Sequence, residues 1–162
     1  MRRPAPAGTP LALRIAATFF LVGEAAPFAP ATFASLLFVP FLWPFLDWPV
    51  WLQVALTLLV TWVAILVSDR AEKYYGHDAR PITIDEVAGM MVTFLMIPAG
   101  ETVADRCLVL LAGFVLFRIM DVVKPFPAGR AQHLPGGKGV VMDDFLAGIY
   151  ANLALRILLR FI

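Results

Sequence analysis

Charged residues, cysteine and histidine are all scarce in this sequence. Only 15% of the 162 residues are charged, and the chain has one cysteine and two histidines. A soluble domain carries about 25% charged residues, so an ordinary water-soluble enzyme and a disordered chain are both excluded. The single cysteine, Cys107, excludes an intramolecular disulfide and a cysteine-rich metal site. The formal net charge of +1 gives no reason to expect a nucleic-acid partner.

Apolar residues make up 60% of the chain, and the mean hydropathy is +0.81. One domain over residues 1–162 fits the length, and the composition indicates a lipid bilayer as its solvent. The best candidate span, Val50–Val67, has eighteen uncharged residues and tryptophans at its flank. The weaker apolar segments are Ser35–Leu46, Val87–Pro98, Leu108–Met120 and Phe145–Ile162. We therefore expect an all-α polytopic membrane bundle with four or five crossings.

Two other stretches have a distinct character. The apolar segment Leu11–Gly23 follows a basic, proline-rich start but is interrupted by Arg14, which favours an N-terminal interfacial helix over a cleaved signal peptide. Pro125–Val141 contains four glycines and several prolines, and we expect an irregular loop there. The other expected loops are Glu24–Ala34, Gly76–Thr83 and Ala99–Ala104.

Five carboxylates adjoin three of the apolar segments. If the segments alternate in direction across the membrane, all five acids reach the same face. These acids are Asp85, Glu86, Asp121, Asp143 and Asp144. Most of the basic residues reach that face too: Arg70, Lys73, Arg80, Arg118, Lys124, Arg130 and Lys138. Because an excess of lysine and arginine marks the cytoplasmic side, the acidic face is predicted to be cytoplasmic.

Clustered carboxylates repel one another unless a cation lies among them. Oxygen ligands suit Mg²⁺, which takes one or two carboxylates together with waters and substrate phosphate. Arg118, Lys124 and Lys138, the last within a Gly-Gly-Lys-Gly turn, are suited to hold that phosphate. The sequence has no evident nucleophilic loop of the known phosphatase classes, so water activated by a metal ion is the simplest chemistry.

Structural explanations remain open for several of these residues. Asp121 and Lys124 are three apart and can form an ion pair within one helix. Asp143 can cap the helix that follows it. Thr32 and Ser35 can cap the Ser35–Leu46 helix or contact phosphate. A divalent-cation carrier explains the acids but not the nearby lysines, and a structural subunit would tolerate alanine at all five acids.

Three blocks of sequence resemble the signature blocks of the phosphatidylglycerophosphatase A family. They are ITIDEVAGMMVTFLMIP (82–98), FRIMDVVKPFP (117–127) and HLPGGKGVVMDDFLAG (133–148). Their order and spacing agree with the family, so the resemblance spans nearly the whole chain. It implies a phosphatase of the bacterial inner membrane that converts phosphatidylglycerophosphate to phosphatidylglycerol with Mg²⁺, and that has its active site facing the cytoplasm.

The resemblance also implies roles for individual residues. The catalytic set would be Asp85, Glu86, Asp121, Asp143 and Asp144, of which Asp85, Glu86, Asp121 and Asp144 would bind Mg²⁺. The substrate phosphate would contact Arg118, Lys124, Lys138, Thr32 and Ser35. The only partner implied is the phospholipid substrate in the bilayer, and the sequence leaves the oligomeric state open.

One block departs from the family. Its first block is close to PGTxGSLxxxxP, whereas this chain has PATFASLLFVP at 30–40. Thr32, Ser35 and Pro40 agree, but Ala31 and Ala34 stand where the family has glycines. If those glycines provide a positive φ or a close backbone approach, the loop differs in shape here, and contacts from Thr32 and Ser35 to phosphate would change.

Overall fold

The computed structural model describes residues 5–161, which form eight helices and no strand. The expected all-α class is therefore confirmed for this range. Residues 1–4 and Ile162, which belong to the single expected domain, lie outside the described residues. The helices are α1 (Leu11–Ala17), α2 (Val22–Ala25), α3 (Pro30–Phe45), α4 (Val50–Tyr75), α5 (Ile84–Phe94), α6 (Val103–Val123), α7 (Ala128–Ala131) and α8 (Gly137–Leu158).

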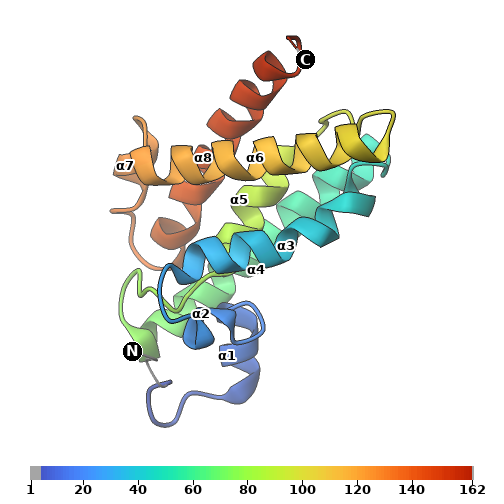
Figure 1. The fold of residues 1–162 in the computed structure, drawn as a ribbon. Helices are drawn as coiled ribbons and strands as arrows, with labels where there is room; N and C mark the ends of the chain where they lie inside the picture. The colour runs from blue at the N-terminus through green and yellow to red at the C-terminus, as the bar shows by residue number, and fades with distance from the viewer. Residues whose placement is uncertain (1–4, 162) are drawn as a thin grey trace.

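The short helix α5 lies at the centre of the bundle (Figure 1) and packs against α3, α4, α6 and α8. Every residue from Asp85 to Phe94 is buried. Eleven residues span about 16 Å, which is too short to cross about 30 Å of hydrocarbon. The segment predicted as Val87–Pro98 is thus an internal core helix that other helices surround.

Side chains from neighbouring helices satisfy the backbone at the end of α5. The Asn152 amide donates to the carbonyl of Leu95 at 2.9 Å, and Arg156 donates to the carbonyls of Leu95 and Met96. From α4, Gln53 accepts a hydrogen bond from the backbone N–H of Met96 at 2.8 Å. These bonds let a short helix end inside an apolar bundle, where unpaired backbone groups are costly.

Two glycines bring α5 and α8 into close contact. A side chain at Gly148 would collide with the carbonyl of Gly89 and with the side chain of Val92. A side chain at Gly89 would collide with Phe117 and with the carbonyl of Asp144. The two helices can therefore approach closely, and this contact sets the position of the acids on α5 relative to those on α8.

Enlarging Gly148 should destabilise the protein. We expect Gly148→Val to cost about 1–3 kcal/mol in the free energy of unfolding, because overpacking moves backbone that has no room to yield. Thermal melting of the detergent-solubilised protein, followed by size-exclusion chromatography, measures the change. Ile149→Val, at the neighbouring exposed position, is the matched control. Equal melting temperatures for the two variants would contradict the proposed close contact.

Helix α4 has the side-chain distribution of a membrane helix. Its buried stripe is polar or small and includes Gln53, Thr57 and Ser68, while Leu58 and Trp62 are exposed. Within residues 5–161 it is the one helix long and apolar enough to cross a membrane. Only 22% of its most apolar window is buried, so it is not the core helix of a soluble protein. Outward apolar and inward small residues suit contact with lipid.

Three sequence expectations about boundaries were wrong. Helix α3 begins at Pro30, so the predicted loop Glu24–Ala34 is helical over its last five residues. Helix α8 begins at Gly137 rather than Phe145. The first apolar segment is not one helix but breaks into α1 and α2, and a partly buried ion pair between Arg14 and Glu24 at 2.6 Å joins the two pieces.

Candidate active site

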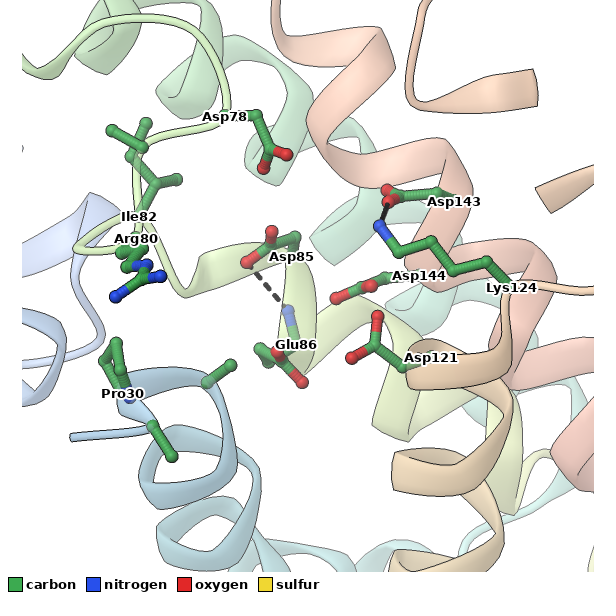
Figure 2. Close-up of a pocket in the computed structure, with 13 residues that line it drawn as sticks. Pro30, Asp78, Arg80, Ile82, Asp85, Glu86, Asp121, Lys124, Asp143 and Asp144 are labelled. Carbon is green, nitrogen blue, oxygen red and sulfur yellow. Dashed lines mark hydrogen bonds and ion pairs between the residues drawn. The ribbon is translucent and has the colours of Figure 1, made fainter. Parts of the chain in front are cut away.

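A pocket of about 460 Å³ lies where five segments end or begin. Its walls are the start of α3, the loop before α5, the first turn of α5, the end of α6 and the second turn of α8. Figure 2 shows the labelled acids facing one another across it. The residues with ionisable side chains that line it are Asp78, Arg80, Asp85, Glu86, Asp121, Lys124, Asp143 and Asp144.

All five acids singled out from the sequence therefore line one pocket. They come from three helices, and the alternation of α5, α6 and α8 brings the relevant ends to the same side of the bundle. Because α5 begins with its two acids, the positive end of the helix dipole also lies at the pocket, where it favours negative charge.

Arg118 joins the acids of two helices. Its guanidinium donates to Glu86 at 2.5 Å and lies 3.0 Å from the carboxylate of Asp121, one turn further along α6. Glu86 also accepts a hydrogen bond from the Ser35 hydroxyl at 2.7 Å. Glu86 is thus held from α3 and α6 together, which fixes the first turn of α5 at the base of the pocket.

Lys124 pairs with Asp143 rather than with Asp121. The two charged groups are 2.5 Å apart, and the ammonium group also donates to Gln132 at 3.2 Å. The structural explanation of an Asp121–Lys124 pair is therefore wrong, since Asp121 pairs with Arg118. Asp143 is not a helix cap either, because it lies six residues inside α8. Lys124 instead ties the end of α6 to α8.

Asp85 and Asp144 have no cationic partner among the described residues. Both side chains are buried, and Asp144 has a carboxylate oxygen without any hydrogen-bond partner. Asp85 accepts only the backbone N–H of Glu86, at 3.0 Å. Burial, followed by the nearby charges of Glu86 and Asp143, raises the pKa of Asp85 well above its ordinary value. These two are the buried carboxylates of the pocket that lack a cationic partner within the described residues.

The pocket carries an excess of negative charge. Six carboxylates line it, against the cations Arg80 and Lys124 and the adjoining Arg118. If all are ionised, three negative charges are uncompensated before any phosphate enters. A buried oxygen of Asp143 also has no partner. Unpaired buried carboxylate oxygens with excess negative charge fit a hard divalent cation.

The four metal ligands predicted from the sequence do not surround a common point in the observed side-chain conformations. Among residues 5–161, no three His, Cys, Asp or Glu side chains come together closely enough to hold one ion. Two of the four, Glu86 and Asp121, are held by Arg118 instead. Mg²⁺ commonly takes only one or two carboxylates and completes its shell with water and phosphate, so the remaining pair, Asp85 and Asp144, is suited to it.

Four predicted phosphate-binding residues do not line the pocket: Arg118, which only adjoins it through Glu86 and Asp121, and Lys138, Thr32 and Ser35. Lys138 is exposed, in the first turn of α8. The adjoining Gly137 packs against the backbone of α4 at Ile65, so the glycines serve helix contact there. Thr32 and Ser35 lie inside α3 rather than at its N-cap, which is Ala29. Their capping role is therefore excluded.

The alanines at the departure from the family sequence cause no backbone strain. Ala31 and Ala34 lie within α3, and neither has a positive φ. Ala34 is fully buried and packs with Phe19 and Val87. The positive φ of this segment occurs at Ala29 instead. The start of α3 therefore forms its wall of the pocket as a regular helix.

Sequence reasoning gave no reason to single out Arg80. The alternation of segments placed it on the acidic face, as one of seven basic residues there. In Figure 2 its guanidinium lies at the pocket across from Asp121 and Lys124, and it forms no ion pair with any residue in the described range. Asp78, also in the loop before α5, lines the same wall. The resemblance to the family gave a signal for Asp78, but only the folded loop shows that both residues line the pocket.

Comparisons with known proteins agree on one family. The sequence model of "Phosphatidylglycerophosphatase A" matches residues 15–159. A relative from Escherichia coli named phosphatidylglycerophosphatase A is 33% identical over 127 residues, which is 76% of this chain and 70% of that protein. One from Haemophilus influenzae with the same name is 38% identical over 76 residues, 46% of this chain and 44% of that protein.

A further relative carries a different name. The "Putative phosphatidylinositol-3-phosphatase" of Bacteroides thetaiotaomicron is 35% identical over 138 residues, which is 81% of this chain and 84% of that protein. No solved structure matches the chain. The names share one chemistry, the removal of phosphate from the head group of a phospholipid.

Proposed function

The chain belongs to the phosphatidylglycerophosphatase A family and is a phosphatase, and from this premise we propose that it hydrolyses the terminal phosphate of phosphatidylglycerophosphate with Mg²⁺ in the pocket between α3, α5, α6 and α8. The observation that carries the proposal is the buried, uncompensated pair Asp85 and Asp144 in a pocket that also contains cations. A cation carrier gives no account of those cations, and family membership favours the enzyme over a structural subunit.

Different residues in and beside the pocket would have different roles in the reaction. Asp85 and Asp144 would provide the carboxylate oxygens that hold Mg²⁺, and Glu86 or Asp144, which line the same pocket, would accept a proton from the attacking water. Arg80, Lys124 and Arg118 offset the charge on the phosphoryl oxygens. Bound Mg²⁺ would supply Lewis acidity toward phosphate and make water more acidic.

Several observations support a location in the bacterial inner membrane with the pocket at the cytoplasmic surface. Helix α4 presents apolar side chains outward, and the lipid substrate's chains lie in the bilayer. The end of the bundle that carries the pocket also carries Arg70, Lys73, Arg80 and Lys124, and the opposite end has fewer basic residues. We propose that α3, α6 and α8, which do not by themselves have the length and hydropathy of α4, cross together with it as one bundle, and that α5 remains internal.

The head group is tested by comparing phospholipids. Purified protein in neutral detergent is given dioleoyl phosphatidylglycerophosphate, phosphatidylinositol 3-phosphate or phosphatidic acid, and released phosphate is measured with and without Mg²⁺. We expect phosphatidylglycerophosphate to give the highest kcat/KM. A preference for phosphatidylinositol 3-phosphate would show that this chain has the activity in the name of the Bacteroides relative instead. Release from none of the three would overturn the proposal.

Among the described residues, Arg80 is the pocket cation that forms no ion pair, so it is available to bind substrate phosphate. We expect Arg80→Gln to raise KM by about 10- to 100-fold, because a hydrogen bond to a charged group contributes about 1.5–3 kcal/mol. Arg70→Gln is the matched control, since Arg70 is exposed on α4 and its side chain contacts only the carbonyl of Leu66. Steady-state kinetics on phosphatidylglycerophosphate measures both. An unchanged KM in Arg80→Gln would remove Arg80 from the phosphate site.

A further inference from the structure

An apolar groove of about 330 Å³ runs between α3 and α6. Its α3 side includes Leu36, Val39 and Trp43, and its α6 side includes Cys107, Leu111 and Phe114. No charged residue lines it, and it shares no lining residue with the acidic pocket. Leu36 and Leu111 are more than half exposed within the groove walls, so the folded chain does not itself fill this space.

The same two helices form the acidic pocket and the groove. Helix α3 lines the pocket at Pro30 and Ala31, and it reaches the groove five residues later, at Leu36. Helix α6 runs in the opposite direction and lines the groove at Phe114, seven residues before Asp121 in the pocket. At 1.5 Å per residue the groove begins about 8–10 Å from the pocket along the helices.

The groove extends for two further helical turns and then meets polar groups. From Leu36 to Trp43 is about 10 Å along α3. At that end the Arg106 guanidinium lies 5.1 Å from the centre of the Trp43 ring, and it forms an ion pair with Asp47 at 2.7 Å. The groove is therefore apolar along its length and ends at a fixed aromatic and charged group.

These dimensions match a phospholipid whose phosphate lies in the acidic pocket. The head-group region of one leaflet is about 5–8 Å deep, and hydrocarbon begins below it. A phosphate in the acidic pocket would thus place the acyl chains of the same lipid at the level of Leu36 and Phe114. We propose that the groove between α3 and α6 binds one acyl chain of the substrate phospholipid. This inference rests on the proposed function, because it takes the ligand of the pocket to be a lipid.

The first test narrows the groove. Leu111→Trp should displace part of the acyl chain from the groove. Loss of the burial of two methylenes, at about 0.8 kcal/mol each, weakens binding of the acyl chain about 10-fold. We therefore expect the ratio of kcat/KM for dioleoyl over dibutanoyl phosphatidylglycerophosphate to fall about 10-fold. Leu58→Trp, on the exposed face of α4, should leave the ratio unchanged. An unchanged ratio in Leu111→Trp, or an equal fall in both variants, would overturn the proposal.

The second test does not depend on turnover. Cys107 is the chain's only cysteine and lies exposed in the groove, so its rate of alkylation by a maleimide reports occupancy. In detergent, dioleoyl phosphatidylglycerophosphate should slow alkylation severalfold, whereas the dibutanoyl lipid and dioleoyl phosphatidylcholine should not. Equal protection by phosphatidylcholine, or protection that depends on protein concentration without lipid, would overturn the proposal, since bulk lipid or a second copy would then occupy the groove.

The two tests separate this inference from the proposed function. If the wild-type protein releases no phosphate from any phospholipid, the proposed function fails while Cys107 still reports on the groove. If phosphate is released but Leu111→Trp does not distinguish long from short chains, the groove assignment fails and the function stands.

Discussion

Asp144→Asn is expected to lower kcat for phosphatidylglycerophosphate by about 10³-fold, within the range that loss of a catalytic acid or base produces. Asp144 is 4% exposed, lines the pocket and has a carboxylate oxygen without a hydrogen-bond partner. Asparagine keeps the shape of the side chain but removes the charge that would hold Mg²⁺ or accept a proton. Phosphate release from detergent-solubilised protein measures the effect.

The stability of this variant distinguishes lost chemistry from lost folding. A buried charge without a partner is costly, so Asp144→Asn should melt at the same temperature as the wild-type protein or higher. Asp47→Asn is the control, because Asp47 lies at the opposite end of the bundle in an exposed pair with Arg106. A variant of Asp144 that keeps its turnover, or one that unfolds, would contradict the catalytic assignment.

Removing divalent cations should abolish turnover. We expect excess EDTA to lower the rate at least about 100-fold, since a metal ion contributes several kcal/mol to the stabilisation of a phosphoryl transition state. The reason lies in the pocket, where six carboxylates exceed the neighbouring cations by three charges and would repel a phosphate dianion. Phosphate release is measured against free Mg²⁺ after dialysis.

Adding Mg²⁺ back distinguishes loss of the metal ion from damage to the protein by EDTA. Adding Mg²⁺ back should recover the full rate, while Na⁺ at equal ionic strength should not. Turnover that persists in EDTA would show that the cations Arg80, Lys124 and Arg118 are enough for the reaction and that no divalent ion is needed.

The position of the acids could be predicted from the sequence because consecutive apolar segments of a helical bundle alternate in direction. Acids at the start of α5, the end of α6 and the start of α8 must then share one end of the bundle. This argument needs only the order of apolar segments and the sites of charge. It holds even though α5 is an internal helix, since the chain still reverses direction there.

The pairing of charges could not be predicted in the same way. Lys124 is three residues from Asp121, and local spacing favours that pair. The helix ends after Val123, however, and Lys124 has a positive φ of 46°, which turns the chain so that its side chain reaches Asp143 on α8. Such a choice depends on how two distant helices pack, and local sequence does not determine that.

The role of the glycine-rich turn could not be predicted from the sequence either. A lysine between glycines is typical of a phosphate-binding turn, but Gly137 and Gly139 lie where any side chain would strike the backbone of α4 or of the preceding loop. The glycines allow close packing, which lets α8 begin eight residues earlier than its apolar pattern indicates. Lys138 is exposed and does not line the pocket.

The most direct test is to measure how tightly divalent cations bind at the pocket. Mn²⁺ binds hard oxygen sites as Mg²⁺ does, and its electron paramagnetic resonance signal distinguishes free from bound ion. We predict saturable Mn²⁺ binding to the wild-type protein, displaced by Mg²⁺, with affinity at least about 10-fold weaker in Asp85→Asn and Asp144→Asn and unchanged in Asp47→Asn. Equal affinity in all four proteins would contradict a divalent cation held by these two buried carboxylates.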